Sequence, residues 1–78
     1  MEIINKEGTK TINYSKANCV YVEEKKTINP YYIVKADYNN YVYIVAEFDT
    51  LTEAKQFIKD LAYAEANGIS IYEVQEGR

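Results

Sequence analysis

Histidine and tryptophan are absent from the sequence, and its 78 residues include one cysteine, one proline and three glycines. A single cysteine, Cys19, excludes a disulfide within the chain. Without histidine, one thiol provides too few ligands for a structural zinc site. A free thiol is typical of a reducing compartment, and we therefore expect a cytoplasmic location.

Long hydrophobic runs are also missing. No stretch approaches the roughly 18–20 consecutive apolar residues that a membrane span requires, and residues 1–6 lack the basic and apolar regions of a signal peptide. The length is that of a single domain, residues 1–78, with a core that buries about 60–65% of the unfolded surface. Because such a core supplies little net stability, we expect either that it just suffices or that the protein oligomerises.

Neither sign of charge dominates. Twelve acidic and nine basic residues give a net charge of −3, and Arg78 is the single arginine. A nucleic-acid-binding protein needs a basic surface that releases counterions, so nucleic acid is not the expected partner. The glycines Gly8, Gly68 and Gly77 are isolated, which excludes a glycine-rich phosphate-binding loop.

What the sequence does contain is a series of β-branched and aromatic runs and one amphipathic helix. A glycine after three polar residues, Asn5 to Glu7, indicates a short N-terminal hairpin. The predicted elements are hairpin strands at 3–4 and 11–12, a connector at 14–18, strands at 19–25, 31–37 and 41–48, a helix at 51–66, a strand at 69–74 and a fraying tail at 75–78. The predicted fold class is α+β: an antiparallel sheet of about five or six strands, the N-terminal hairpin included, with the helix packed on one face and a final short strand.

The predicted helix has signals at both ends. Thr50 and Glu53 form a capping box, and Asn67-Gly68 predicts a left-handed C-terminal cap. Apolar residues at helical spacing mark the face that packs on the sheet. They are Leu51, Ala54, Phe57, Ile58, Leu61 and either Ala62 or Ala64.

Strands 31–37 and 41–48 form a predicted hairpin whose register decides which residues are buried. The even-numbered residues form the predicted core face, under the helix; they are Tyr32, Val34, Ala36, Val42, Ile44, Ala46 and Phe48. The two even sets share a face only if the loop has an odd length, because a one-residue slip inverts every side chain. We therefore predict a three-residue loop, Tyr38-Asn39-Asn40, with Asn40 in the left-handed conformation.

The opposite face of this hairpin is rich in tyrosine, and no other segment is available to cover it. An exposed apolar patch on a small protein is typical of a binding surface, and tyrosine is enriched at interfaces. The candidate partner-binding residues, two of them from the preceding strand, are Tyr31, Ile33, Asp37, Tyr41, Tyr43, Val45, Glu47, Tyr21 and Glu23. Two alternatives stay open: the face is a homodimer seam, or A/T-rich codon usage alone explains the tyrosines.

No catalytic, metal or cofactor site is indicated. Glu23 and Glu24 are adjacent on a strand and point to opposite faces, so they cannot act as an acid–base pair. Asp37 and Glu47 share a face but lie toward opposite ends of the hairpin. Cys19 has no histidine to activate it and is interpreted as a half-buried strand residue. We expect no enzymatic activity and no cofactor.

Two segments carry a resemblance to known proteins: VYVEE at 20–24 and AEFDTLTEAKQFIKDL at 46–61. Together, and through the strand-then-helix signature FDTxxEAxxFI, they resemble short, uncharacterised proteins of low-GC bacteria, their prophages and phages. The A/T-rich codons of the commonest residues agree with that origin. The resemblance implies a small acidic protein of the anti-defence type, of which anti-CRISPR proteins are examples, and it supplies no site residues.

The leading hypothesis is a non-catalytic, phage- or prophage-encoded inhibitor in the host cytoplasm. It binds a bacterial defence or regulatory protein through the tyrosine-rich face. One alternative is an oligomer that sequesters a nucleotide signal, although phosphates require cations that this chain has in short supply. The other is a homodimeric structural protein. A stacking platform for single-stranded nucleic acid is disfavoured, because only Lys35 accompanies the tyrosines.

Overall fold

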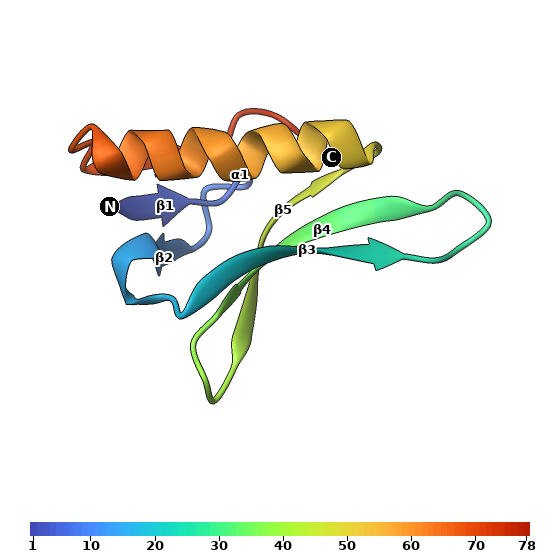
Figure 1. Ribbon diagram of the computed structural model, residues 1–78, viewed down its shortest axis with the longest axis horizontal. Helices are drawn as coiled ribbons and strands as arrows, with labels where there is room; N and C mark the ends of the chain where they lie inside the picture. Colours follow the sequence, from blue (N-terminus) through green and yellow to red (C-terminus); the bar gives the residue numbers. More distant parts are fainter.

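The computed structural model describes all residues, 1–78, and contains six β-strands, one α-helix and a short 3-10 helix (Figure 1). The strands are β1 (Glu2–Ile4), β2 (Thr11–Asn13), β3 (Cys19–Lys25), β4 (Tyr31–Asp37), β5 (Val42–Phe48) and β6 (Ile71–Glu73), and the helices are η1 (Tyr14–Lys16) and α1 (Leu51–Ala66). The predicted α+β class, with antiparallel strands and one α-helix, is confirmed.

The six strands are divided between two three-stranded sheets. Strands β3, β4 and β5 form the larger, antiparallel sheet. The N-terminal hairpin of β1 and β2 does not join it; β1 instead pairs with β6, in parallel. Parallel strands need a long connection between them, and here α1 returns the chain to β1 before β6 begins. In Figure 1 the helix lies along both sheets, with its C-terminal half over β1.

Both predicted helix ends are confirmed. The Thr50 hydroxyl oxygen accepts a hydrogen bond from the Glu53 backbone N–H at 3.2 Å and donates to the Glu53 carboxylate at 2.8 Å. At the other end Gly68 has φ of 75°, and the N–H of Ile69 donates to the carbonyl of Ala64 at 3.0 Å. This is a Schellman motif, which satisfies carbonyls that the helix end leaves unpaired.

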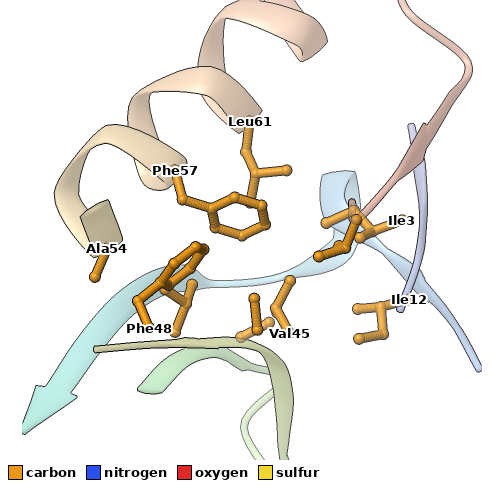
Figure 2. Close-up of a cluster of buried hydrophobic side chains, with 11 residues drawn as sticks. Ile3, Ile12, Val45, Phe48, Ala54, Phe57 and Leu61 are labelled. Carbon is orange, nitrogen blue, oxygen red and sulfur yellow. The ribbon is translucent and has the colours of Figure 1, made fainter. Parts of the chain in front are cut away.

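One hydrophobic core lies between α1 and the two sheets (Figure 2). The helix contributes Ala54, Phe57 and Leu61, which are at most 1% exposed. Leu51, predicted on the same face, is 40% exposed, so the buried stripe begins at Ala54. The rings of Phe48 and Phe57 have centroids 5.1 Å apart. Because Ile3 and Ile12 point into this core from β1 and β2, both sheets are held by the same cluster.

A β-bulge in β5 overturns part of the predicted hairpin register. Val34 pairs with Ala46, but the next pair is Lys35 with Ile44, so Val45 is an extra residue in β5. A bulge of this kind leaves one residue unpaired and shifts the alternation of side chains on either side of it. Val45 and Ala46 are consequently both buried, at 2% and 9% exposure.

Because of the bulge, several residues of β5 lie on the opposite face of the hairpin to the one predicted. Before it, Val42 and Ile44 lie outside the core, against the prediction, with exposed fractions of 46% and 47%. Tyr43 and Val45, predicted on the open face, lie on the core side instead. After the bulge the prediction holds again, and Phe48 is 1% exposed.

The predicted three-residue loop is wrong for the same reason. The backbone N–H of Tyr38 donates to the carbonyl of Tyr41 at 3.0 Å, which closes a two-residue turn. Asn39, rather than Asn40, has the positive φ, at 73°. A two-residue turn suits the twist of a hairpin, and the bulge at Val45 then restores the register that the core requires.

The C-terminal tail, predicted to fray, packs against the edge of β5. The backbone N–H of Arg78 donates to the carbonyl of Glu47 at 2.8 Å, and Lys6 Nζ donates to the carbonyl of Gly77 at 2.5 Å. Gly77 has φ of 95°, and a Cβ at this position would lie 2.5 Å from the Glu47 carbonyl oxygen. Glycine is required where the backbone approaches this closely in that conformation.

Candidate protein-binding face

The larger sheet has one face under α1 and one face turned away from it, which we call the outer face. The strand register places side chains on the outer face in rows across β3, β4 and β5. Its residues are Cys19, Tyr21, Glu23 and Lys25 from β3, Tyr31, Ile33, Lys35 and Asp37 from β4, and Val42, Ile44 and Glu47 from β5. No helix or loop of the chain packs over the rows nearest the β4–β5 turn, as the exposure of their side chains shows.

Those rows carry an exposed apolar patch, formed by Cys19, Tyr21, Val42 and Ile44. Tyr21 is 36% exposed, and the two aliphatic residues are nearly half exposed. Cys19 is also exposed, which corrects the expectation of a half-buried thiol. The four side chains lie in adjacent rows, with Lys35 between Tyr21 and Ile44 on the central strand. Contiguous apolar exposure of this kind is typical of an interaction site on a small protein.

The other end of the outer face is charged and internally paired. Lys35 Nζ lies 2.8 Å from the Glu23 carboxylate, and this hydrogen bond lowers the pKa of Glu23 and raises the pKa of Lys35. The Arg78 guanidinium lies 4.3 Å from the centroid of the Tyr31 ring and 3.3 Å from Asp49. These contacts pair Glu23 and Arg78 within the chain, whereas the side chains of the apolar patch have no such partners.

The structure brings together six of the nine predicted partner-binding residues. The six on the outer face are Tyr21, Glu23, Tyr31, Ile33, Asp37 and Glu47. Ile33 is only 5% exposed and offers little area to a partner. Tyr41, Tyr43 and Val45 belong to the other side of the hairpin.

Sequence reasoning missed Cys19, Val42 and Ile44 as surface residues. Strand 41–48 is apolar at both its odd and its even positions, so alternation alone does not distinguish its two faces. No residue in it is a glycine or proline that marks the bulge. The one signal of the bulge in the sequence is that strand 41–48 is equally apolar at its odd and its even positions.

Two of the tyrosines that were expected on the open face, Tyr41 and Tyr43, form a cluster with Tyr38 at the β4–β5 turn, on the inner side. The ring centroids of Tyr38 and Tyr43 are 5.4 Å apart, and those of Tyr41 and Tyr43 are 5.2 Å apart. The Tyr38 hydroxyl donates to the carbonyl of Asn13 at 2.6 Å, and burial raises its pKa. Lys10 Nζ lies 5.0 Å from the Tyr43 centroid. The cluster thus joins the turn to the N-terminal hairpin.

Apart from the outer face, a concave region with a volume of about 400 Å³ lies between α1 and β6, and three carboxylates line it. The carboxylates belong to Glu53, Asp60 and Glu76, and the Tyr72 hydroxyl donates to Glu76 at 3.1 Å. Burial raises the pKa of Tyr72 to about 12, so the phenol stays protonated at neutral pH. No group of three or more histidine, cysteine, aspartate or glutamate side chains is placed to hold a metal ion.

Comparisons with protein-family models, with curated proteins and with solved structures give no match. The structure also has no helix whose length and apolar character would let it cross a bilayer. Any function therefore has to be argued from the surface itself, and the outer face is the largest feature of that surface that lacks partners within the chain.

Proposed function

We propose that this is a non-catalytic binding protein and that its outer face binds another protein. The observation that carries the proposal is the apolar patch: Tyr21 on β3 and Val42 and Ile44 on β5 are 36–47% exposed on either side of the central strand β4 of one sheet. Scattered exposed apolar residues need no explanation, but a contiguous group of them does. Burial of apolar surface in an interface contributes a favourable free energy of about 25 cal/mol per Å².

The surroundings of the patch suit a protein interface. Interfaces have an apolar centre with large rigid side chains and a polar rim. Tyr21 supplies a rigid aromatic ring, and the stem of Lys35 lies beside it. Asp37 and Glu47 stand at the edges of the face, so we expect a partner with an apolar surface bordered by basic groups, since complementary charge directs association.

The finer identity of the partner rests on the sequence resemblance. Within this proposal the protein is a phage- or prophage-encoded inhibitor that acts in the cytoplasm of the host and blocks a defence or regulatory protein. A pre-formed sheet face supports inhibition by coverage, because little ordering of the free protein has to precede binding.

The test is affinity capture with matched surface variants. The double substitution Val42→Asp and Ile44→Asp places charge in the patch, and Ile71→Asp is the control, since Ile71 is 59% exposed on β6 of the other sheet. We expect the control and the unchanged protein to retain the same host protein and the double variant to lose at least about 2 kcal/mol of binding. Circular dichroism melts confirm that both variants fold.

Hydrogen exchange on the captured complex locates the contact. We expect slower exchange in β3, β4 and β5 of the complex than of the free protein, and no change in β6. Equal capture by the double variant, or protection confined to α1 and β6, would show that the outer face is not the binding site.

A further inference from the structure

The larger sheet has two edges, and the C-terminal tail binds at only one of them. Arg78 hydrogen-bonds to Glu47 at the β5 edge. At the other edge β3 pairs with β4 over seven consecutive residues without a bulge, and no other strand pairs with it. β3 contains no proline, and a long, regular, uncovered edge strand is a template for pairing with another strand.

We propose that β3 pairs antiparallel with β3 of a second copy, about a two-fold axis at Tyr21, so that two chains form one six-stranded sheet. The pattern of β3 supports a copy of itself as the occupant. In this register Tyr21 faces Tyr21, Val20 faces Val22, and Cys19 faces Glu23 of the second copy. Aromatic and β-branched pairs across antiparallel strands stabilise a sheet.

The alternative symmetric registers are less favourable. An axis at Val22 sets Val20 opposite Glu24, and an axis at Glu23 sets two carboxylates directly opposite each other. Like charges in that position destabilise the pairing. The register centred on Tyr21 has no pair of like charges and matches the largest apolar side chains of the strand.

The inner side of the proposed junction also gains burial. Val20 and Val22 are only half-buried and already pack against the core cluster from its margin. The same two residues of the second copy would lie against them and extend the core across the axis. This matters for a chain in which 12 of 78 residues are buried, because such a small core supplies little net stability.

The β3–β4 loop provides a second point of contact. It extends at one end of the molecule, away from α1 (Figure 1). Its Ile28 is 99% exposed, and the Thr27 hydroxyl donates to the carbonyl of Asn29 at 2.8 Å, which orders the loop. Lys25 and Lys26 precede it, so the loop presents an apolar side chain beside two cations.

A hollow beside the start of β3 matches this loop. It has a volume of about 320 Å³, and its lining includes Tyr14, Ala17, Val20 and Glu65. The Ser15 hydroxyl donates to Glu65 at 2.6 Å and lowers the pKa of that carboxyl, and the N-terminal ammonium of Met1 lies 3.4 Å from its other oxygen. The register sets Lys25 of the second copy opposite Ala17, so the loop that follows it arrives at the hollow.

This pairing goes beyond the proposed binding function, and of the patch residues it involves only Tyr21 and Cys19. A dimer would place the two outer faces side by side, with their apolar patches joined at the Tyr21 axis. The patch residues Val42 and Ile44 belong to β5, on the opposite edge from β3. Loss of partner binding through β5 therefore does not prevent dimerisation through β3, and the two tests have separate readouts.

The first experiment measures the mass of the unchanged protein by light scattering and sedimentation over a dilution series, without any partner. We expect a dimer that dissociates on dilution. A monomer at every concentration would overturn the proposal, whatever any variant does.

The second experiment tests the register by oxidation. In Cys19→Ser with Tyr21→Cys, the new thiols face each other at the axis, and we expect a covalent dimer to form at least about tenfold faster than in the control, Cys19→Ser with Lys25→Cys. Lys25 lies opposite Ala17, far from its own copy. Equal rates for the two variants would overturn the Tyr21 register.

The third experiment tests the loop contact. Ile28→Asp should raise the dissociation constant of the dimer by about tenfold or more. The control Ile71→Asp, at an isoleucine that is 59% exposed on β6, should leave it unchanged. An unchanged constant for Ile28→Asp would show that the loop and the hollow do not meet.

Discussion

The two faces of the larger sheet come from the same three strands, yet one is buried and the other is partly exposed to solvent. The inner face lies under α1 and holds Val34, Ala36 and Phe48, each at most 1% exposed. The outer face holds residues of comparable hydrophobicity, Val42 and Ile44, that stay nearly half exposed. The difference teaches that hydrophobicity alone does not decide burial in a small domain: one helix covers one face, and the surplus apolar area stays available for contacts with other molecules.

The largest expected effect comes from placing a charge at the buried Val45 of β5 rather than at the exposed residue next to it. Val45→Asp puts a carboxylate into the core without a partner, which costs several kcal/mol, and we expect the protein to unfold at room temperature. Ile44→Asp, at the preceding residue, places its carboxylate opposite Lys35 on the outer face and should change the free energy of unfolding by no more than about 0.5 kcal/mol. Urea titrations followed by circular dichroism measure both. Similar losses for the two variants would contradict the bulge.

Truncation of the core ranks next. Phe57→Ala removes a ring that contacts Phe48 and Tyr72, and the cavity should cost about 3–5 kcal/mol. Ile44→Ala on the outer face should cost much less, since the side chain is already 47% exposed. The ratio of the two urea midpoints sharpens the comparison between the faces. A comparable cost for Ile44→Ala would mean that the outer face is covered in solution.

Gly77→Ala tests the tail at the edge of β5, with a smaller effect. Positive φ costs a residue with a Cβ about 1–2 kcal/mol, and the added carbon would clash with the Glu47 carbonyl. We expect the tail to detach rather than the domain to unfold, with a loss of about 1 kcal/mol and faster amide exchange at Arg78. Gly8→Ala is the matched control for positive φ, because a Cβ at Gly8 meets no atom within 4 Å. A tail that stays protected in Gly77→Ala would refute the steric argument.

The smallest effect is a pH dependence at the charged end of the outer face. The pKa of Glu23 in the folded protein lies below its ordinary value of 4.5, chiefly through the hydrogen bond from Lys35. The pair therefore stabilises the fold fully above that value, and this contribution is lost as the pH falls through the lowered pKa. We expect Glu23→Gln to flatten the fall in stability between about pH 5 and pH 2. An unchanged slope in urea titrations across this range would show that the ion pair does not affect folding.

Features of the fold that depend on contacts between residues close in the sequence could be predicted, and features that depend on contacts between distant segments could not. The helix ends were predicted correctly, because Thr50, Glu53 and Gly68 act on backbone groups within a few residues of themselves. The bulge at Val45 was not predicted. It is needed because the two-residue turn sets a register that would place Phe48 on the outer face, and only contacts with the distant core require the other register. The parallel pairing of β6 with β1 and the docking of the tail are likewise contacts between segments about 70 residues apart.

The candidate site shows the same division. The prediction of one uncovered sheet face followed from counting helices, and six of its nine residues lie where they were placed. The assignment of Val42 and Ile44 failed because β5 is apolar on both sides, and the register that decides between them depends on the bulge.

The docked tail has a consequence for how such a sheet can grow. A sheet with two open edges can add copies at both and extend without limit into a fibre. Here Arg78 hydrogen-bonds to Glu47 at one end of the β5 edge, whereas β3 is unpaired along the whole of its outer side. The tail would thus hinder the addition of a strand at β5 and favour growth of the sheet at β3 alone.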